Sequence, residues 1–289
     1  MDMPAVWDQV IIFAFTFVAN LFASVSGGGA GFVQFPLLIL MGLPFATALG
    51  THKVAVVFLG IGAMAKKKST AYHIDKRIML VMLLIGCPAV VAGTLIIINV
   101  PAQIAELIVG LVTVAMGIYT LLKKSFGAEG LEHIPLWRFI LGCMLILLVG
   151  LFSGSLSSGA GLFATLTLTL VFGLELKRAI YHTMVFVATL WNAVGAFTVG
   201  AVTAIYWQWI PAMIIASFTG AFVGTALLLK LPVAKVRIIF SLVSILSGVL
   251  LVYTSIADSH KDQVEDTLTQ TNSHSYSYSQ SYDQIHSHS

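Results

Sequence analysis

The chain has 289 residues, of which 58% are hydrophobic and only 9% are charged. Soluble domains carry about 25% charged residues, so this composition and the mean hydropathy of +0.96 exclude an ordinary soluble protein. They indicate a polytopic membrane protein, and the net charge of +3 gives no sign of a nucleic-acid partner. The N-terminus has no basic region followed by a cleavage site, so we expect the first apolar run to be retained.

Ten apolar runs follow one another along the chain. They cover about residues 7–25, 31–43, 46–64, 77–98, 103–122, 137–153, 161–173, 177–199, 207–229 and 234–256. A helix needs about 20 residues to cross a bilayer, so the runs 31–43 and 161–173 are too short. We predict that each is a half-helix, paired with the preceding run in a broken hairpin. The predicted fold class is an all-α integral membrane protein with ten helical segments and about eight hydropathy peaks.

The ten runs form two repeats of five, over about residues 7–122 and 137–256. Three glycine or proline signals recur 131 positions later: Gly93-Thr94 as Gly224-Thr225, Pro101 as Pro232, and Gly117 as Gly248. An odd number of segments per repeat places the two halves in opposite orientations. We therefore predict one transmembrane domain over residues 1–257, built from inverted repeats. The polar tail 258–289 has too few aliphatic residues to bury and is expected to be disordered.

Basic residues give the orientation, because Lys and Arg concentrate in cytoplasmic loops. Thirteen of the 15 fall in four clusters, at 66–77, 123–138, 177–178 and 230–237, which leaves Lys53 and the tail residue Lys261. These clusters alternate between the two repeats as an inverted duplication requires. We predict a multi-pass protein of the plasma membrane with both termini outside.

Two Gly- and Ser-rich segments, 24–31 and 153–161, interrupt apolar runs at matching positions. Broken backbone at membrane depth persists only where it lines a cavity or is buried in protein, and paired breaks mark the substrate site of many transporters. The half-helix N-termini next to them attract anions. Close helix packing is the alternative explanation for the glycines. The candidate binding residues here are Ser26, Gly27, Gly28, Gly29, Gln34, Ser157, Ser158, Gly159 and Asn192.

Lys53 is the basic side chain that lies well inside an apolar run. A buried charge needs a partner, and the absence of a carboxylate at that depth favours an anionic substrate; the alternative is that the side chain reaches the outer interface. Thr51-His52 and His182-Thr183 occupy equivalent repeat positions in reversed order. Histidine can carry a proton at physiological pH. Either His52 or His182 could therefore couple proton movement to transport; the alternative is that both are packing residues.

The stretch 27–36 (GGGAGFVQFP), followed by Gly42-Leu43-Pro44 and Ala48-Leu49-Gly50-Thr51, resembles the TauE/SafE family of bacterial sulfite exporters and anion permeases. The resemblance covers about residues 7–256. It implies an all-helical membrane protein that moves small, often sulfur-containing anions across the plasma membrane. Where the family pattern often continues with Ser-Leu, this chain has His52-Lys53, which suggests a subgroup with its own ligand.

No nucleotide-binding, metal or catalytic motif occurs, so the sequence predicts neither an enzyme nor a cofactor or metal site. The expected partners are a small anionic solute and the lipid bilayer, with protons as a candidate coupling ion. The leading hypothesis is a secondary transporter. An anion channel, or a membrane assembly protein whose glycines only pack helices, are the alternatives.

Overall fold

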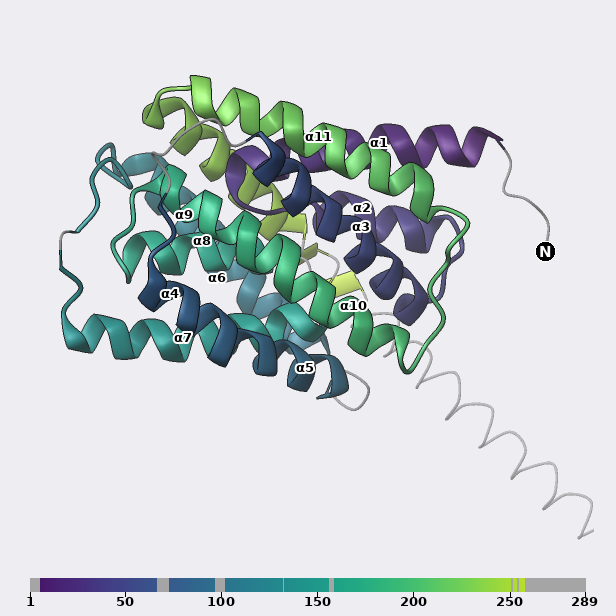
Figure 1. Ribbon diagram of the computed structural model, residues 1–289, viewed down its shortest axis with the longest axis horizontal. Helices are drawn as coiled ribbons and strands as arrows, with labels where there is room; N and C mark the ends of the chain where they lie inside the picture. Colours follow the sequence, from purple (N-terminus) through teal and green to yellow (C-terminus); the bar gives the residue numbers. More distant parts are fainter. Residues whose placement is uncertain are drawn as a thin grey trace, which may run out of the picture.

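The computed structural model describes residues 6–66, 73–96, 102–131, 133–155, 159–250, 252–253 and 255–257. In this part of the chain the regular structure is entirely helical (Figure 1). The first half contains α1 Val6–Ser26, α2 Gly31–Leu40, α3 Phe45–Ala65, α4 Lys76–Val81, the π-helix η1 Met82–Gly86, α5 Cys87–Ile96 and α6 Ala102–Leu122. The second half contains α7 Leu136–Ser155, α8 Ala160–Leu170, α9 Leu176–Thr183, the π-helix η2 Met184–Trp191, α10 Asn192–Gly200 and α11 Ile210–Lys230, followed by the C-terminal helix Val233–Ala257.

All ten predicted segments are confirmed as helices. Three consecutive elements, α4–η1–α5, form one continuous span over Lys76–Ile96, and α9–η2–α10 form another over Leu176–Gly200. Seven helices of the described residues are long and apolar enough to cross a membrane, and α6, with 21 residues, equals them in length. The half-helices α2 and α8 have only 10 and 11 residues, so each rises about 15 Å, half of the hydrocarbon thickness.

Each broken hairpin packs against a spanning helix of the other half. Helix α1 lies along α11, and α7 lies along α5 (Figure 1). The two contacts are built alike: Gly93 of α5 fits directly against the Leu151 carbonyl, and Gly224 of α11 fits against the Leu21 carbonyl. These pairs are related by the sequence repeat, so the packing supports a structural duplication. Opposite orientation of the halves stays a prediction.

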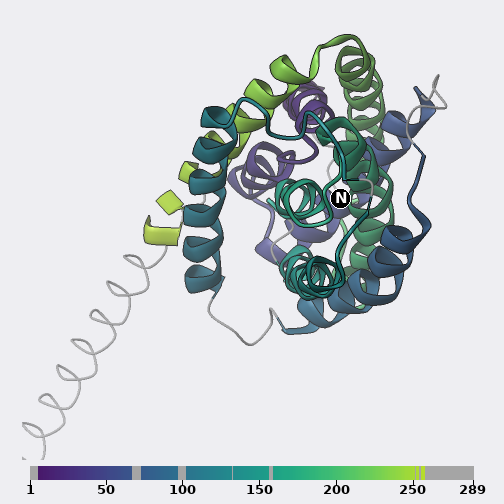
Figure 2. The ribbon, with the colours of Figure 1, turned by 90° about the vertical axis from the view of Figure 1, so that its left-hand side faces the viewer.

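Helix α6 and the C-terminal helix, which are equivalent in the repeat, pack on one another at one side of the bundle (Figure 2). Gly117 approaches Ile245, Gly110 approaches Val252, and the hydroxyl oxygens of Thr120 and Ser241 lie 2.7 Å apart. Small residues at this contact let the two backbones come close, as is typical of helix pairs in membranes.

The four clusters of basic residues meet at one end of the bundle. The Arg178 side chain donates to the His73 carbonyl at 3.1 Å, and Arg237 donates to the carbonyls of Lys123 and Lys124. The predicted tail, 258–289, lies outside the described residues.

Helix α3 runs through the centre of the bundle and positions the candidate site. It contacts α1, α2, α10, α11 and η2. Two glycines let its neighbours approach closely: Gly62 faces the backbone of Phe218, and Gly60 faces Thr189 and the Met184 carbonyl. Because α3 is enclosed on most sides, its polar residues Thr51, His52 and Lys53 are all buried.

Candidate functional site

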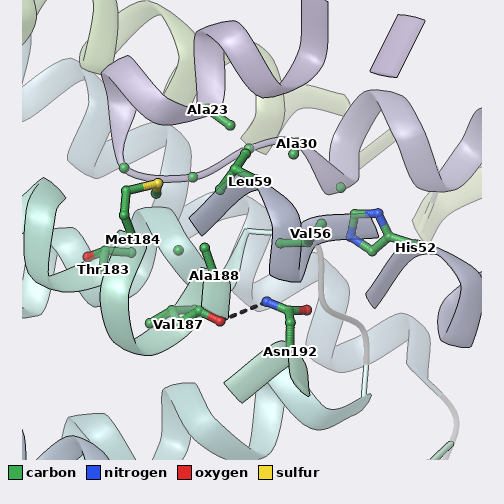
Figure 3. A pocket seen from close by; sticks show the side chains of 15 residues that line it. Ala23, Ala30, His52, Val56, Leu59, Thr183, Met184, Val187, Ala188 and Asn192 are labelled. Carbon is green, nitrogen blue, oxygen red and sulfur yellow. Dashed lines mark hydrogen bonds between the residues drawn. The ribbon is translucent and has the colours of Figure 1, made fainter. Parts of the chain in front are cut away.

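A small cavity of about 40 Å³ lies between the two broken segments, with room for about two or three water molecules. Its walls come from both hairpins, from α3 and from the span that contains η2 (Figure 3). The lining residues are Ala23, Gly27, Gly28, Gly29, Ala30, Gly31, His52, Val56, Leu59, Gly161, Thr183, Met184, Val187, Ala188 and Asn192. The two Gly-rich segments thus meet in the structure, beside a small, partly open cavity.

The two broken segments touch backbone to backbone at this cavity. A Cβ added to Gly28 would lie 2.6 Å from the Leu162 nitrogen, and one added to Gly161 would lie 2.7 Å from the Gly27 carbonyl oxygen. Gly27 and Gly29 also have positive φ values of 81° and 102°, which L side chains rarely adopt. Glycine is therefore required here both by backbone conformation and by contact.

The half-helices α2 and α8 begin beside the cavity. Gly31 starts α2, and Gly161 is the second residue of α8, whose N-cap, Gly159, has a left-handed φ of 84°. The first N–H groups of a helix have no intrahelical partner and carry partial positive charge. Two helix N-termini meeting at one cavity give it a polarity that favours an anion.

His52 and Thr183 contribute side chains at equivalent repeat positions, on opposite sides of the cavity (Figure 3). Each is held by a residue of the neighbouring half-helix: the His52 Nδ1 atom lies 3.0 Å from Gln34 Oε1, and the Thr183 hydroxyl lies 2.9 Å from that of Thr165. Gln34 itself does not line the cavity, but its side chain holds the His52 imidazole in place. The equivalent bonds show how each half-helix fixes one polar group at the site.

Thr51 and His182, the other members of the reversed pairs, do not line the cavity. Thr51 accepts a hydrogen bond from the Tyr206 N–H at 3.0 Å and donates to the Thr47 carbonyl at 2.7 Å. His182 does the same work in the other repeat: Nε2 accepts from the Asp75 N–H at 3.1 Å, and Nδ1 lies 2.8 Å from the Arg178 carbonyl. All three positions in this arrangement correspond by the 131-residue offset. Since Nε2 accepts a hydrogen bond and Nδ1 must donate one to a carbonyl, His182 is a neutral imidazole that ties two segments together.

Lys53 is fully buried, and its amine donates to the Ser153 carbonyl at 2.7 Å. Ser153 lies in the last turn of α7, so Lys53 links the central helix to the second broken hairpin. The alternative that this side chain reaches the outer interface is wrong, because none of it is exposed. It is not a lining residue of the cavity.

The remaining predicted residues are Ser26, Gly159, Asn192 and the pair Ser157 and Ser158. The Ser26 hydroxyl lies 2.9 Å from the Phe22 carbonyl oxygen and 2.8 Å from that of Gly28, within its own loop. Gly159 caps α8 and packs near Phe32. Asn192 lines the cavity and donates to the Val187 carbonyl at 2.8 Å (Figure 3). Ser157 and Ser158 lie outside the described residues.

The π-helix η2 supplies lining residues that sequence reasoning missed. The Thr189 hydroxyl donates to the Met184 carbonyl at 3.0 Å, five residues back. The Asn192 side-chain amide donates to the Val187 carbonyl over the same interval. Such wide turns often occur at functional sites because they redirect side chains. Met184 could have been found from the repeat, since it occupies the position equivalent to Lys53.

Comparisons with known proteins agree with this architecture. The chain is 28% identical over 215 residues to a probable membrane transporter protein, ORF9, of Sinorhizobium sp, covering 74% of this chain and 80% of that protein. It is 25% identical over 264 residues to the probable membrane transporter protein YfcA of Escherichia coli strain K12, covering 88% and 91%. A probable membrane transporter protein of Haemophilus influenzae is 25% identical over 253 residues, covering 84% and 94%. No solved structure matches the chain significantly.

The family model described as sulfite exporter TauE/SafE matches residues 12–251. This region includes both broken hairpins, the cavity between them and nearly all of the C-terminal helix. The chain is therefore a multi-pass membrane protein that belongs to the TauE/SafE family of membrane transporters.

Proposed function

We propose that this protein is a secondary transporter that moves a small, sulfur-containing anion such as sulfite or a sulfonate across the plasma membrane, with protons as the coupling ion. One observation carries the proposal: the N-termini of two half-helices meet at a small cavity that is also lined by His52. The family description and the relatives' names support transport in general.

The composition of the cavity favours an anion. The lining residues include five consecutive glycine and alanine positions, 27–31, whose backbone can approach a ligand closely, and no Asp or Glu. An oxyanion of sulfur offers several acceptor oxygens to N–H and hydroxyl donors. We assign Gly27, Gly28, Gly29, His52, Thr183 and Asn192 as substrate contacts, with Gln34 orienting His52.

The size of the cavity favours a carrier over a channel. At about 40 Å³ it has room for about two or three water molecules, less than a sulfonate needs, so the broken segments must move apart to admit one. A channel would need a continuous open path, and an assembly protein would need no cavity at all.

The test is anion flux into proteoliposomes of the purified protein. We expect saturable uptake of sulfite or methanesulfonate, accelerated by unlabelled anion inside, as exchange through a carrier requires. His52→Gln should raise KM about tenfold or more, the loss expected for one charge-assisted or buried hydrogen bond.

A matched control is His182→Gln, which also removes a buried imidazole, but one that lies outside the cavity. It should lower thermal stability and leave KM near the wild-type value. Flux that rises linearly with concentration and shows no exchange would favour a channel. No flux of any of these anions would contradict the proposal and favour the assembly role.

We propose further that the basic end of the bundle faces the cytoplasm, which places both termini outside. Lys124→Cys in a background without Cys87 and Cys143 should be labelled by an impermeant maleimide only after the inner face is opened. Labelling in intact cells would contradict this orientation.

A further inference from the structure

The Lys53 amine is buried although it does not line the cavity, so contact with a ligand there does not account for its burial. Its side chain is fully buried and ends against the Ser153 carbonyl, 2.7 Å away. Gly195 of α10 makes room for it, since a Cβ added there would lie 3.0 Å from both Nζ and Cδ. An ammonium has three donors, and the described residues give this nitrogen one acceptor.

The helices around Lys53 offer almost nothing to balance a positive charge. Of the elements that pack against α3, neither α2, η2 nor α10 has a titratable residue, α11 has Lys230 at its last position, and α1 has Asp8, half-exposed in its first turn. In α7 the nearest titratable residue is Cys143, ten residues before Ser153 and so about 15 Å along the helix. The titratable neighbour of Lys53 is His52, the residue before it in the chain, and His52 lines the cavity.

Two partial sources of negative charge remain. One is the C-terminal end of α7, where the carbonyl groups carry partial negative charge; Ser153 and Gly154 there accept from Lys53 and from the Thr94 hydroxyl. The other is an anion in the cavity beside His52. Attraction between opposite charges is strong where water is excluded, so a bound anion would favour the ammonium over the neutral amine.

We propose that Lys53 is the binding site of the coupling proton, an inference that rests on the proposed function. With the cavity empty the amine is neutral; when an anion enters, the amine takes up one proton and becomes an ammonium. The proton and a monovalent anion then cross together, and on release both leave. By linkage, the anion binds more tightly as the pH falls.

Protonation also changes the tie between α3 and α7. A charged donor makes a shorter and stronger hydrogen bond than a neutral one. The ammonium therefore holds the Ser153 carbonyl, and with it the end of the second broken hairpin, more firmly than the amine does. This connects the proton to the segment that must move when the cavity opens.

The test uses proteoliposomes of the full chain with a pH dye inside and an alkaline interior. The probe is methanesulfonate, which does not itself titrate near neutral pH, or sulfite if that is the anion carried. Wild type should accumulate the anion about tenfold per pH unit, the limit for one proton per monovalent anion, and the interior should acidify with the same time course. Lys53→Met should abolish accumulation and acidification, while anion-for-anion exchange falls much less.

Lys66→Met is the matched control, because it removes a lysine at the end of the same helix, outside the enclosed region; it should accumulate as wild type does. Gly195→Ala serves if Lys53→Met folds poorly, since it keeps the amine but displaces it, and should shift the pH at which uptake is half-maximal. Full accumulation by Lys53→Met, or loss of coupling in His52→Gln alone, would overturn the inference and leave transport standing. No anion flux by wild type would overturn the proposed function, and this inference with it.

Discussion

Gly28→Ala probes the contact between the two broken segments directly. The added methyl group would lie 2.6 Å from the Leu162 nitrogen, 2.7 Å from the Gly161 carbonyl carbon and 2.8 Å from its Cα. All three are backbone atoms, which cannot rotate away as a flexible side chain could. Gly28 has no positive φ, so the effect of the substitution comes from packing and not from backbone strain.

The magnitude follows from the overlap. Carbon atoms in contact normally lie about 3.5–4.0 Å apart, so the segments must separate by roughly 1 Å to admit the methyl group. Overpacking of this kind costs about 1–3 kcal/mol, and the rigid neighbours place Gly28→Ala near the upper end. Because the same two segments form the walls of the cavity, transport should fall with stability.

The assay is the unfolding midpoint in detergent, followed by flux in proteoliposomes. Two other glycines serve as controls: Gly130→Ala meets its nearest atom at 3.4 Å and should be neutral, while Gly42→Ala meets nothing within 4 Å and tests backbone strain at a φ of 93°. Wild-type stability and flux in Gly28→Ala would refute the contact between the broken segments.

Three further outcomes follow from the contacts. Thr183→Val removes a hydroxyl from the cavity wall and should raise KM for the anion in the flux assay, whereas Thr51→Val removes one outside the cavity and should lower the unfolding midpoint without raising KM. Trp191→Phe removes the indole N–H that bonds a backbone carbonyl of η1 at 2.9 Å, and should reduce the free energy of unfolding by about 1 kcal/mol in denaturant titrations. Gly93→Ala and Gly224→Ala push apart equivalent helix pairs and should destabilise by similar amounts, about 1–3 kcal/mol each; a neutral result for either would contradict the matched packing.

The helical segments could be predicted from the sequence because each depends on local properties. An apolar run of sufficient length has one stable form in a bilayer, and the Gly- and Ser-rich breaks end α1 and α7 where the sequence predicts. The repeat offset can also be read directly from the sequence, and it identifies which positions of the two halves are equivalent. For these reasons the predicted bounds agree closely with the observed ones, as for the run 103–122 and α6 Ala102–Leu122.

That Lys53 and His182 lie outside the cavity was harder to predict, because their side chains bond to backbone. Lys53 and His182 both end on main-chain groups of distant segments, at Ser153 and Asp75. Every residue has a carbonyl and an N–H, so nothing in the sequence distinguishes these partners from others. The π-helix η2 has no sequence signature either, and it decides which residues of its span line the cavity.

Residues at equivalent positions of the two halves line the site, but they differ in chemistry. His52 faces Thr183 across the cavity, and the position equivalent to Lys53 is the apolar Met184. Both titratable groups thus come from the first repeat, on consecutive residues of the central helix, while the second repeat presents neutral groups. If the protein alternates between two conformations, as the proposed transport requires, the equivalent contacts of Gly93 and Gly224 would let the two halves exchange them at little cost. Under the proposed function, the asymmetric side chains determine what this exchange depends on: an anion would contact both repeats through the half-helix N-termini, whereas a proton would be held by the first repeat.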